Sequence, residues 1–260
     1  KQPSMGIAGL AQWTRKSLAQ AYVPAPSPAD HVHVDCASLA HDAVRHARTD
    51  EQAVARLATR LADLVTGEAQ PGLSLALALD GPAPLAKLAT QRQRRLARAR
   101  SGGAGGDGAS AGAGVGGGGD DTRKRKKQHG NHHHRGSKNE GPSSLALTPG
   151  TPFMARLDAF LVLWAAELLS RDAHHRSSLP HSGVCIHVGP SGAEGEGEHK
   201  LFARMAAMPH HARDSHTHLV VGGDADLLVL ALACPARHVY VFDGEVAAGR
   251  GGGRGGLGAK

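Results

Sequence analysis

The sequence predicts an α/β fold, in which a mostly parallel sheet is flanked by helices. Two observations lead to this prediction. Short apolar segments recur along the chain with few interruptions, and segments with helical spacing lie between them. Continuous apolar segments are typical of strands that are buried on both faces. Strands that alternate with helices are usually connected into a parallel sheet.

The predicted elements follow one another along the chain. The clearest helix runs from Pro152 to Ser170, because Leu157, Leu161 and Trp164 recur at helical spacing. Thr151 is placed to cap this helix, and Pro152 suits its first position. Five segments have the strand pattern: His31–Cys36, Leu73–Asp80, Val184–Val188, His218–Gly222 and His238–Phe242.

Low-complexity stretches divide the chain. Aromatic residues make up only 3% of the 260 residues, whereas there are 35 glycines, many of them in two stretches. Such stretches bury too little apolar surface to offset the entropy lost on ordering. We therefore predict a first half of a folded core at 5–100, a disordered Gly-rich, basic and His-rich linker at 101–143, a second half at 144–246 and a disordered tail at 247–260.

The positive charge is concentrated in two clusters, which account for more than the formal net charge of +7: Arg92 to Arg100 and Arg123 to Lys127. Focused basic patches indicate a polyanionic partner, of which nucleic acid is the leading candidate. The second cluster suggests a nuclear protein, with the cytoplasm as the alternative. No apolar segment has the length of a membrane span, and the sparse cysteines Cys36, Cys185 and Cys234 indicate no disulfide framework.

Acidic residues follow four of the predicted strands. Carboxyl ends of parallel strands meet at one edge of the sheet, where α/β proteins bind ligands. Neighbouring carboxylates raise one another's pKa values unless a hard cation compensates their charge. A single acid after a strand is equally well explained as a loop or cap residue, but the set predicts a site for two Mg²⁺ or Mn²⁺ ions. Its members are Asp35, Asp80, Glu196, Glu198, Asp224 and Asp226.

A basic helix is predicted directly after Asp80. Four of its polar residues share one broad helical face, namely Lys87, Gln91, Arg94 and Arg95. Arg and Lys side chains on one face can bind a terminal phosphate, although a solvated basic helix has the same pattern.

Several motifs resemble the XRN-type 5′→3′ exoribonuclease family, in the order in which the family has them. LDGPAPLAKLATQRQRR at 79–95 is similar to the signature around the family's second acidic residue. TPGTPFMARL at 148–157 resembles the TPGT-x-FM motif, GEGEHK at 195–200 matches a motif of that sequence, and GDADL at 223–227 resembles LDADL. Met5-Gly-Ile, followed by Trp13, is similar to the family's N-terminus.

The resemblance implies a PIN-like, flap-nuclease-related fold that hydrolyses RNA from a 5′-monophosphate end. It implies that the six acids are the catalytic metal ligands. Lys87, Gln91, Arg94 and Arg95 correspond to the pocket for the 5′-phosphate, and His41 to the histidine that contacts the terminal nucleotide. The alternative is that His41 is an ordinary helix residue whose hydrogen-bonding groups are satisfied within the fold.

The sequence also departs from the family pattern. Ala37 stands where the family has Asn, Gly223 replaces Leu, and a later segment with another metal-binding Asp is absent. Two alternatives to an active exoribonuclease therefore stay open. One is a truncated or catalytically weak RNA-binding relative that acts as a scaffold. The other is a flap-type DNA nuclease, which shares the acidic site.

Overall fold

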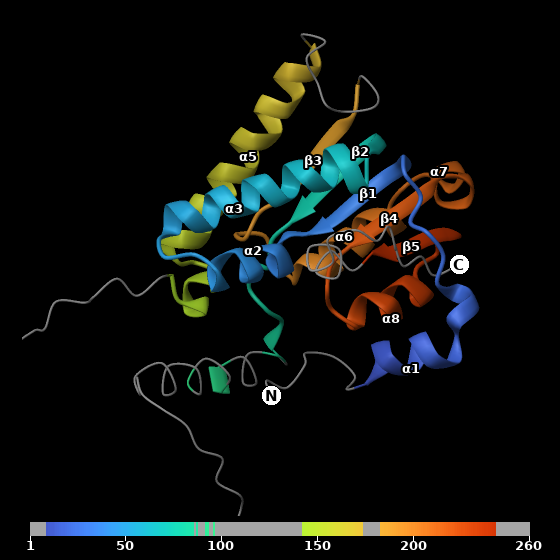
Figure 1. Cartoon of the computed structure of the whole chain (residues 1–260), viewed down its shortest axis with the longest axis horizontal. Helices are drawn as coiled ribbons and strands as arrows, with labels where there is room; N and C mark the ends of the chain where they lie inside the picture. Colours follow the sequence, from blue (N-terminus) through green and yellow to red (C-terminus); the bar gives the residue numbers. More distant parts are fainter. Residues whose placement is uncertain are drawn as a thin grey trace, which may run out of the picture.

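The computed structural model describes residues 9–85, 142–173 and 183–242, together with positions 87, 92, 93 and 96. The predicted tail, nearly all of the predicted linker, and Gln91, Arg94 and Arg95 lie outside the described residues. At the centre is a five-stranded sheet with helices packed against it (Figure 1).

All five strands are parallel, and their order is β3-β2-β1-β4-β5. Strands from before residue 86 therefore pair with strands from after residue 141, and this confirms the predicted α/β class. The observed strands overlap the predicted ones: β1 Ala29–Asp35, β2 Pro71–Ala78, β3 Cys185–Gly189, β4 Thr217–Val221 and β5 His238–Phe242.

Three helices cover one face of the sheet and form the main core. Val32 and Val34 of β1 point to this face, and Leu57 and Leu161 pack there with at most 1% of their surface exposed. Successive strand residues point to opposite faces of the sheet, so only alternate positions of β1 pack into this core. The helices are α2 Cys36–Arg45, α3 Asp50–Asp63 and α5 Pro152–Ala173.

Helix α5 confirms the predicted helix and extends three residues further, to Ala173. The backbone N–H of Met154 donates to the Thr151 hydroxyl oxygen at 3.3 Å, as the predicted cap requires. No helix in the part of the chain that the structure describes is long and apolar enough to cross a bilayer.

A smaller core lies on the opposite face of the sheet. Val220 and Val241 from the strands pack with Phe202 and Met205 of one helix and Leu227 of another. The helices on this side are α6 Gly197–Ala206, α7 His210–Ser215 and α8 Asp226–Ala233. Other short elements are α1 Leu10–Ser17, η1 Ala19–Ala21, η2 Leu64–Glu68 and η3 Ser144–Leu147.

Buried histidines line this second face where β1 pairs with β4. The His31 and His218 rings stack at 4.9 Å between centroids, and His33 and His218 at 5.6 Å. His31 Nδ1 is 2.8 Å from Ser74 Oγ, and His31 Nε2 is 3.0 Å from His216 Nδ1. Burial, followed by the charge of His218, lowers the pKa of His31 to about 4. His31 is therefore neutral at pH 7.

Replacing His31 by glutamine is expected to make stability less sensitive to acid. The folded state keeps His31 neutral, whereas the unfolded chain protonates it near pH 6.5, so stability is present above pH 6.5 and is lost as the pH falls toward 4. Between pH 7.5 and 5.0, wild type should lose about 2 kcal/mol more unfolding free energy than His31→Gln. Urea unfolding at both pH values measures this difference, and parallel losses in the two proteins would contradict it. Other titrating groups contribute to both proteins and largely cancel.

Candidate metal centre

The acidic side chains lie at the carboxyl edge of the sheet, around its topological switch point. The chain leaves β1 toward β2 on one side, whereas β4 lies on the other side of β1. Parallel sheets bind ligands in the crevice at such a point. Asp35 is the last residue of β1, Asp80 follows β2, and Asp224 follows β4. The strand order therefore brings together acids from distant parts of the sequence.

Helix α6 adds two further acids to this edge. Glu196 is the residue before the helix, and Glu198 lies in its first turn. The positive end of the helix dipole favours carboxylates at these positions. The backbone N–H of Gly197 donates to Asp80 Oδ1 at 2.8 Å, so the start of α6 is fixed against the acid that follows β2.

Glycines allow the backbone to pack closely around Asp35. A Cβ atom on Gly197 would lie 3.2 Å from both the Ala78 carbonyl oxygen and Asp35 Oδ1. On Gly222, a Cβ would lie 3.2 Å from Asp35 Cβ and 2.6 Å from Leu227 Cδ1. A side chain at Gly197 would therefore crowd Asp35, and one at Gly222 would require the Leu227 side chain to shift.

The loops after β2 and β3 meet at Gly81. Its N–H donates to the Gly195 carbonyl oxygen at 2.9 Å, and the Gly195 N–H donates to the Pro82 carbonyl oxygen at 3.0 Å. A Cβ on Gly81 would lie only 1.7 Å from the Ala193 carbonyl oxygen, so a side chain cannot fit unless the backbone moves. Gly81 therefore holds the Glu196 loop in place beside Asp80.

Gly81→Ala is expected to reduce the free energy of unfolding by about 3 kcal/mol, because the overpacked contact is with backbone. Gly192→Ala is the matched control, since a Cβ there meets nothing within 4 Å. Denaturant unfolding of the two variants beside wild type measures the difference. Equal stabilities for the two variants would contradict the close approach at Gly81.

Burial and mutual repulsion perturb the acids of this centre. Burial, followed by the charges of Asp80 and Asp224, raises the pKa of Asp35 to about 7. Burial, followed by Asp224, Glu196 and other acids, raises the pKa of Glu198 to about 8. The pKa of Asp224 is also raised, mainly by burial. The protein alone therefore leaves part of the negative charge uncompensated, and a divalent cation would compensate it.

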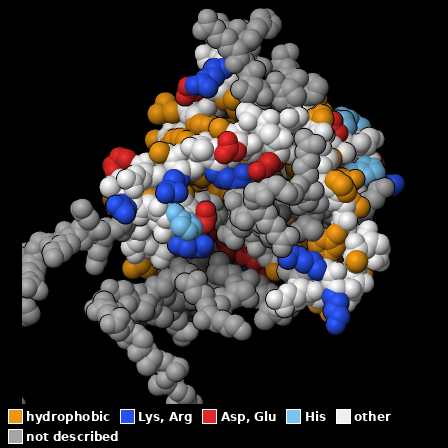
Figure 2. Space-filling view, in the orientation of Figure 1, with side chains coloured by type: hydrophobic (Ala, Val, Ile, Leu, Met, Phe, Trp, Pro, Cys, Tyr) orange, Lys and Arg blue, Asp and Glu red, His pale blue; other side chains and the backbone are white. Residues whose placement is uncertain are grey.

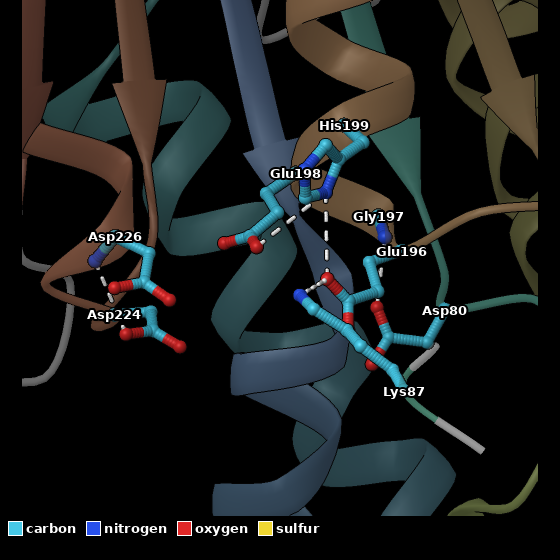
Figure 3. A network of polar contacts seen from close by, with 8 residues as sticks. All are labelled: Asp80, Lys87, Glu196, Gly197, Glu198, His199, Asp224 and Asp226. Carbon is cyan, nitrogen blue, oxygen red and sulfur yellow. Dashed lines mark hydrogen bonds and ion pairs between the residues drawn. The ribbon is translucent and has the colours of Figure 1, made fainter. Parts of the chain in front are cut away.

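Three residues are close enough together to hold one metal ion. Ligand atoms of Glu196, Glu198 and His199 all lie within 4.8 Å of one another. Asp224 and Asp226 face this group across the site (Figure 3). The N–H of Asp226 donates to Asp224 Oδ1 at 3.2 Å. Carboxylate oxygens are the ligands that Mg²⁺ and Mn²⁺ prefer.

All six predicted acids thus belong to one electrostatic cluster. Asp35 interacts with Asp80 and Asp224, while Glu198 interacts with Glu196, Asp224 and Asp226. Figure 2 shows acidic side chains recessed near the middle of one face, with basic and histidine side chains beside them.

A comparison with known protein families shows to which family the chain belongs. The family model described as XRN 5′-3′ exonuclease N-terminus matches residues 5–245. The chain belongs to this exonuclease family. The match spans both sequence segments that build the sheet, and it includes every acid of the cluster.

Curated relatives share part of this region. A 5′-3′ exoribonuclease 2 of Saccharomyces cerevisiae is 34% identical over 105 residues, which are 40% of this chain and 10% of the relative. The Gallus gallus protein of the same name is 33% identical over 105 residues, 39% of this chain and 10% of the relative. The Candida albicans protein of the same name is 36% identical over 105 residues, which are 40% of this chain and 10% of the relative. The aligned region thus spans about a tenth of these relatives.

Of the other predicted site residues, the structure describes only some. Lys87 Nζ is 2.6 Å from Glu196 Oε2, so Lys87 reaches the acidic cluster. His41 is partly buried in α2. Gln91, Arg94 and Arg95 lie outside the described residues, so their predicted role stays a prediction. Asp35 also caps α2, because its Oδ1 accepts the Ala37 N–H at 3.0 Å.

Two residues of the GEGEHK motif have roles that sequence reasoning did not assign. His199 Nδ1 lies 3.4 Å from Glu196 Oε2 and 3.6 Å from Glu198 Oε1. Lys200 Nζ donates to the carbonyl oxygens of Leu79 at 2.9 Å and Pro190 at 2.7 Å. Lys200 therefore ties the ends of β2 and β3 to α6. The only available signal was the position of both residues directly after Glu198.

Proposed function

We propose that this chain is the nuclease core of a metal-dependent 5′→3′ exoribonuclease that degrades RNA with a 5′-monophosphate end. The observation that carries the proposal is the clustering of six acids from four strand ends, in a chain of the XRN family. The 5′-3′ exoribonuclease names of the relatives support the same reaction class. Here the catalytic residues are Asp35, Asp80, Glu196, Glu198, Asp224 and Asp226.

The donor set fits two Mg²⁺ or Mn²⁺ ions. Glu196, Glu198 and His199 would hold one ion, and Asp224 and Asp226, together with Asp35, which interacts electrostatically with Asp224, would hold the other. When bound, the ions supply an activated water and neutralise charge on the phosphodiester. Asp80 fixes the N-terminus of α6 through the Gly197 N–H, and thereby keeps Glu196 and Glu198 in position.

In this proposal, Lys87 binds the substrate's terminal phosphate beside the acids. Its ammonium group is half-exposed and already reaches the cluster at Glu196. With Gln91, Arg94, Arg95 and His41, it would form a pocket for a single 5′-monophosphate. A pocket of that size and charge would exclude 5′-capped and 5′-triphosphate ends, and it would orient the first phosphodiester toward the acids.

The proposal also includes a nuclear location, which rests on the basic residues 123–127, outside the described part of the chain. A fluorescent fusion that accumulates in the nucleus, and stays in the cytoplasm when these five residues are replaced by glutamine, is the expected result. Equal distribution of both fusions would overturn the nuclear assignment.

The proposed reaction is tested with RNA labelled at its 3′ end and carrying a 5′-monophosphate, a 5′-hydroxyl or a 5′-triphosphate. We expect Mg²⁺ or Mn²⁺ to support stepwise loss of the 5′-monophosphate RNA alone, with release of mononucleotides, and EDTA to stop it. A DNA flap substrate tested in parallel distinguishes a flap nuclease. Tight RNA binding by folded protein without hydrolysis would identify the scaffold alternative instead.

A further inference from the structure

One oxygen of the metal centre is already paired with a cation of the protein. Glu196 Oε2 lies 2.6 Å from Lys87 Nζ and 3.4 Å from His199 Nδ1. The Glu196 side chain is only 18% exposed, whereas that of Lys87 is 50% exposed. The carboxylate is thus fixed at the start of α6, and the long lysine side chain is the partner that is free to move away.

A metal ion at Glu196, Glu198 and His199 would compete with this lysine. The ligand atoms of these three residues lie within 4.8 Å of one another, so an ion among them would be close to Glu196 Oε2. The lysine nitrogen is already at hydrogen-bond distance from that oxygen. Two positive charges so close together repel strongly in a partly buried site. A bound divalent cation therefore favours departure of Lys87 from Glu196.

We propose that Lys87 couples metal binding to recognition of the 5′-phosphate. Without metal, Lys87 neutralises Glu196 and is held away from the substrate. Metal binding at Glu196 releases its ammonium group to bind the terminal phosphate. This inference rests on the proposed function, because it takes a divalent cation and a 5′-phosphorylated RNA as the two ligands.

Thermodynamic linkage makes the coupling reciprocal. If metal binding frees Lys87 for the phosphate, phosphate binding must free Glu196 for the metal by the same factor. The RNA end then strengthens metal binding, and metal is bound most tightly when a 5′-monophosphate is in place. A direct attraction between metal and phosphate acts in addition and does not require Lys87.

The first test measures Mn²⁺ binding without RNA, from the electron paramagnetic resonance signal of free Mn²⁺. We expect Lys87→Met to bind Mn²⁺ about fivefold more tightly than wild type, because its competitor is gone. Lys87→Arg retains the charge and should bind as wild type does. Lys16→Met, which removes an exposed lysine from α1, is the matched control and should also resemble wild type.

The second test repeats the titration with a non-hydrolysable oligonucleotide that carries either a 5′-phosphate or a 5′-hydroxyl. In wild type, the 5′-phosphate should tighten Mn²⁺ binding about fivefold more than it does in Lys87→Met. The direct metal–phosphate attraction is present in both proteins and cancels in this comparison. Equal tightening in both proteins would overturn the inference.

The two tests separate this inference from the proposed function. Absence of Mn²⁺ binding by folded wild-type protein would remove the metal-dependent reaction and the coupling together. Mn²⁺ binding that Lys87→Met leaves unchanged or weakens would overturn only the coupling. Circular dichroism of each variant establishes that it is folded before either titration is interpreted.

Discussion

Replacing Asp224 and Asp226 together by alanine is expected to reduce metal-dependent RNA hydrolysis by at least about a thousandfold. Both acids face Glu196 and Glu198 across the centre (Figure 3), so their loss removes one side of the proposed site for two metal ions. The same change should leave the metal-free protein at least as stable as wild type. Burial and like charges raise the pKa of Asp224, so the substitution removes a carboxylate whose charged form is unfavourable in the folded protein.

The control for this prediction is Asp63→Ala, which removes an exposed carboxylate at the end of α3, away from the sheet edge. It should retain wild-type hydrolysis. Initial rates on 5′-monophosphorylated RNA and urea unfolding without metal are measured for all three proteins. A double variant that is folded and keeps a tenth or more of the wild-type rate would remove both acids from the catalytic site.

The stability of the metal-free protein is expected to fall by about 2 kcal/mol between pH 7 and pH 9. Asp35 and Glu198 have folded-state pKa values of about 7 and 8, above those of unfolded chains. Each group then binds a proton in the folded state that the unfolded chain lacks, so its stabilising contribution is lost as the pH rises through the folded pKa. Saturating Mg²⁺ should remove most of this loss, because the ion binds and compensates the deprotonated carboxylates.

Thermal or urea unfolding at both pH values, with and without Mg²⁺, measures this effect. Glu198→Gln should show a smaller loss of stability between pH 7 and pH 9, because glutamine does not titrate. Stability that rises over this range in the absence of metal would show that Asp35 and Glu198 are already ionised at neutral pH.

Much of the fold follows from local sequence pattern. The apolar segments predicted all five strands of this sheet, because the strands of a helix-covered parallel sheet are mainly apolar, although histidines interrupt β1 and β4. In places, the observed strand ends differ from the predicted ones by one or two residues. Strand β2, for example, begins at Pro71 and ends at Ala78, so Asp80 lies in the following loop. The clustering of the acids was predictable because parallel strands present their carboxyl ends at one edge.

Other features depend on which strands become neighbours, and local pattern does not contain that information. The contact between Lys87 and Glu196 joins residues 109 positions apart. It exists because β2 and β3 pair and place their following loops side by side. The stacked histidines of β1 and β4 likewise follow from the register that sets His31 opposite His218. The sequence alone shows no more than that histidines interrupt two otherwise apolar strands.

The most direct test of the proposed metal centre is anomalous diffraction from crystals of this protein soaked with Mn²⁺. We predict anomalous density between Glu196, Glu198 and His199, and a second peak beside Asp224 and Asp226. In Glu198→Gln crystals, the first peak should weaken or disappear. The absence of anomalous density at this edge of the sheet, in crystals at saturating Mn²⁺, would contradict the assignment of these acids as metal ligands.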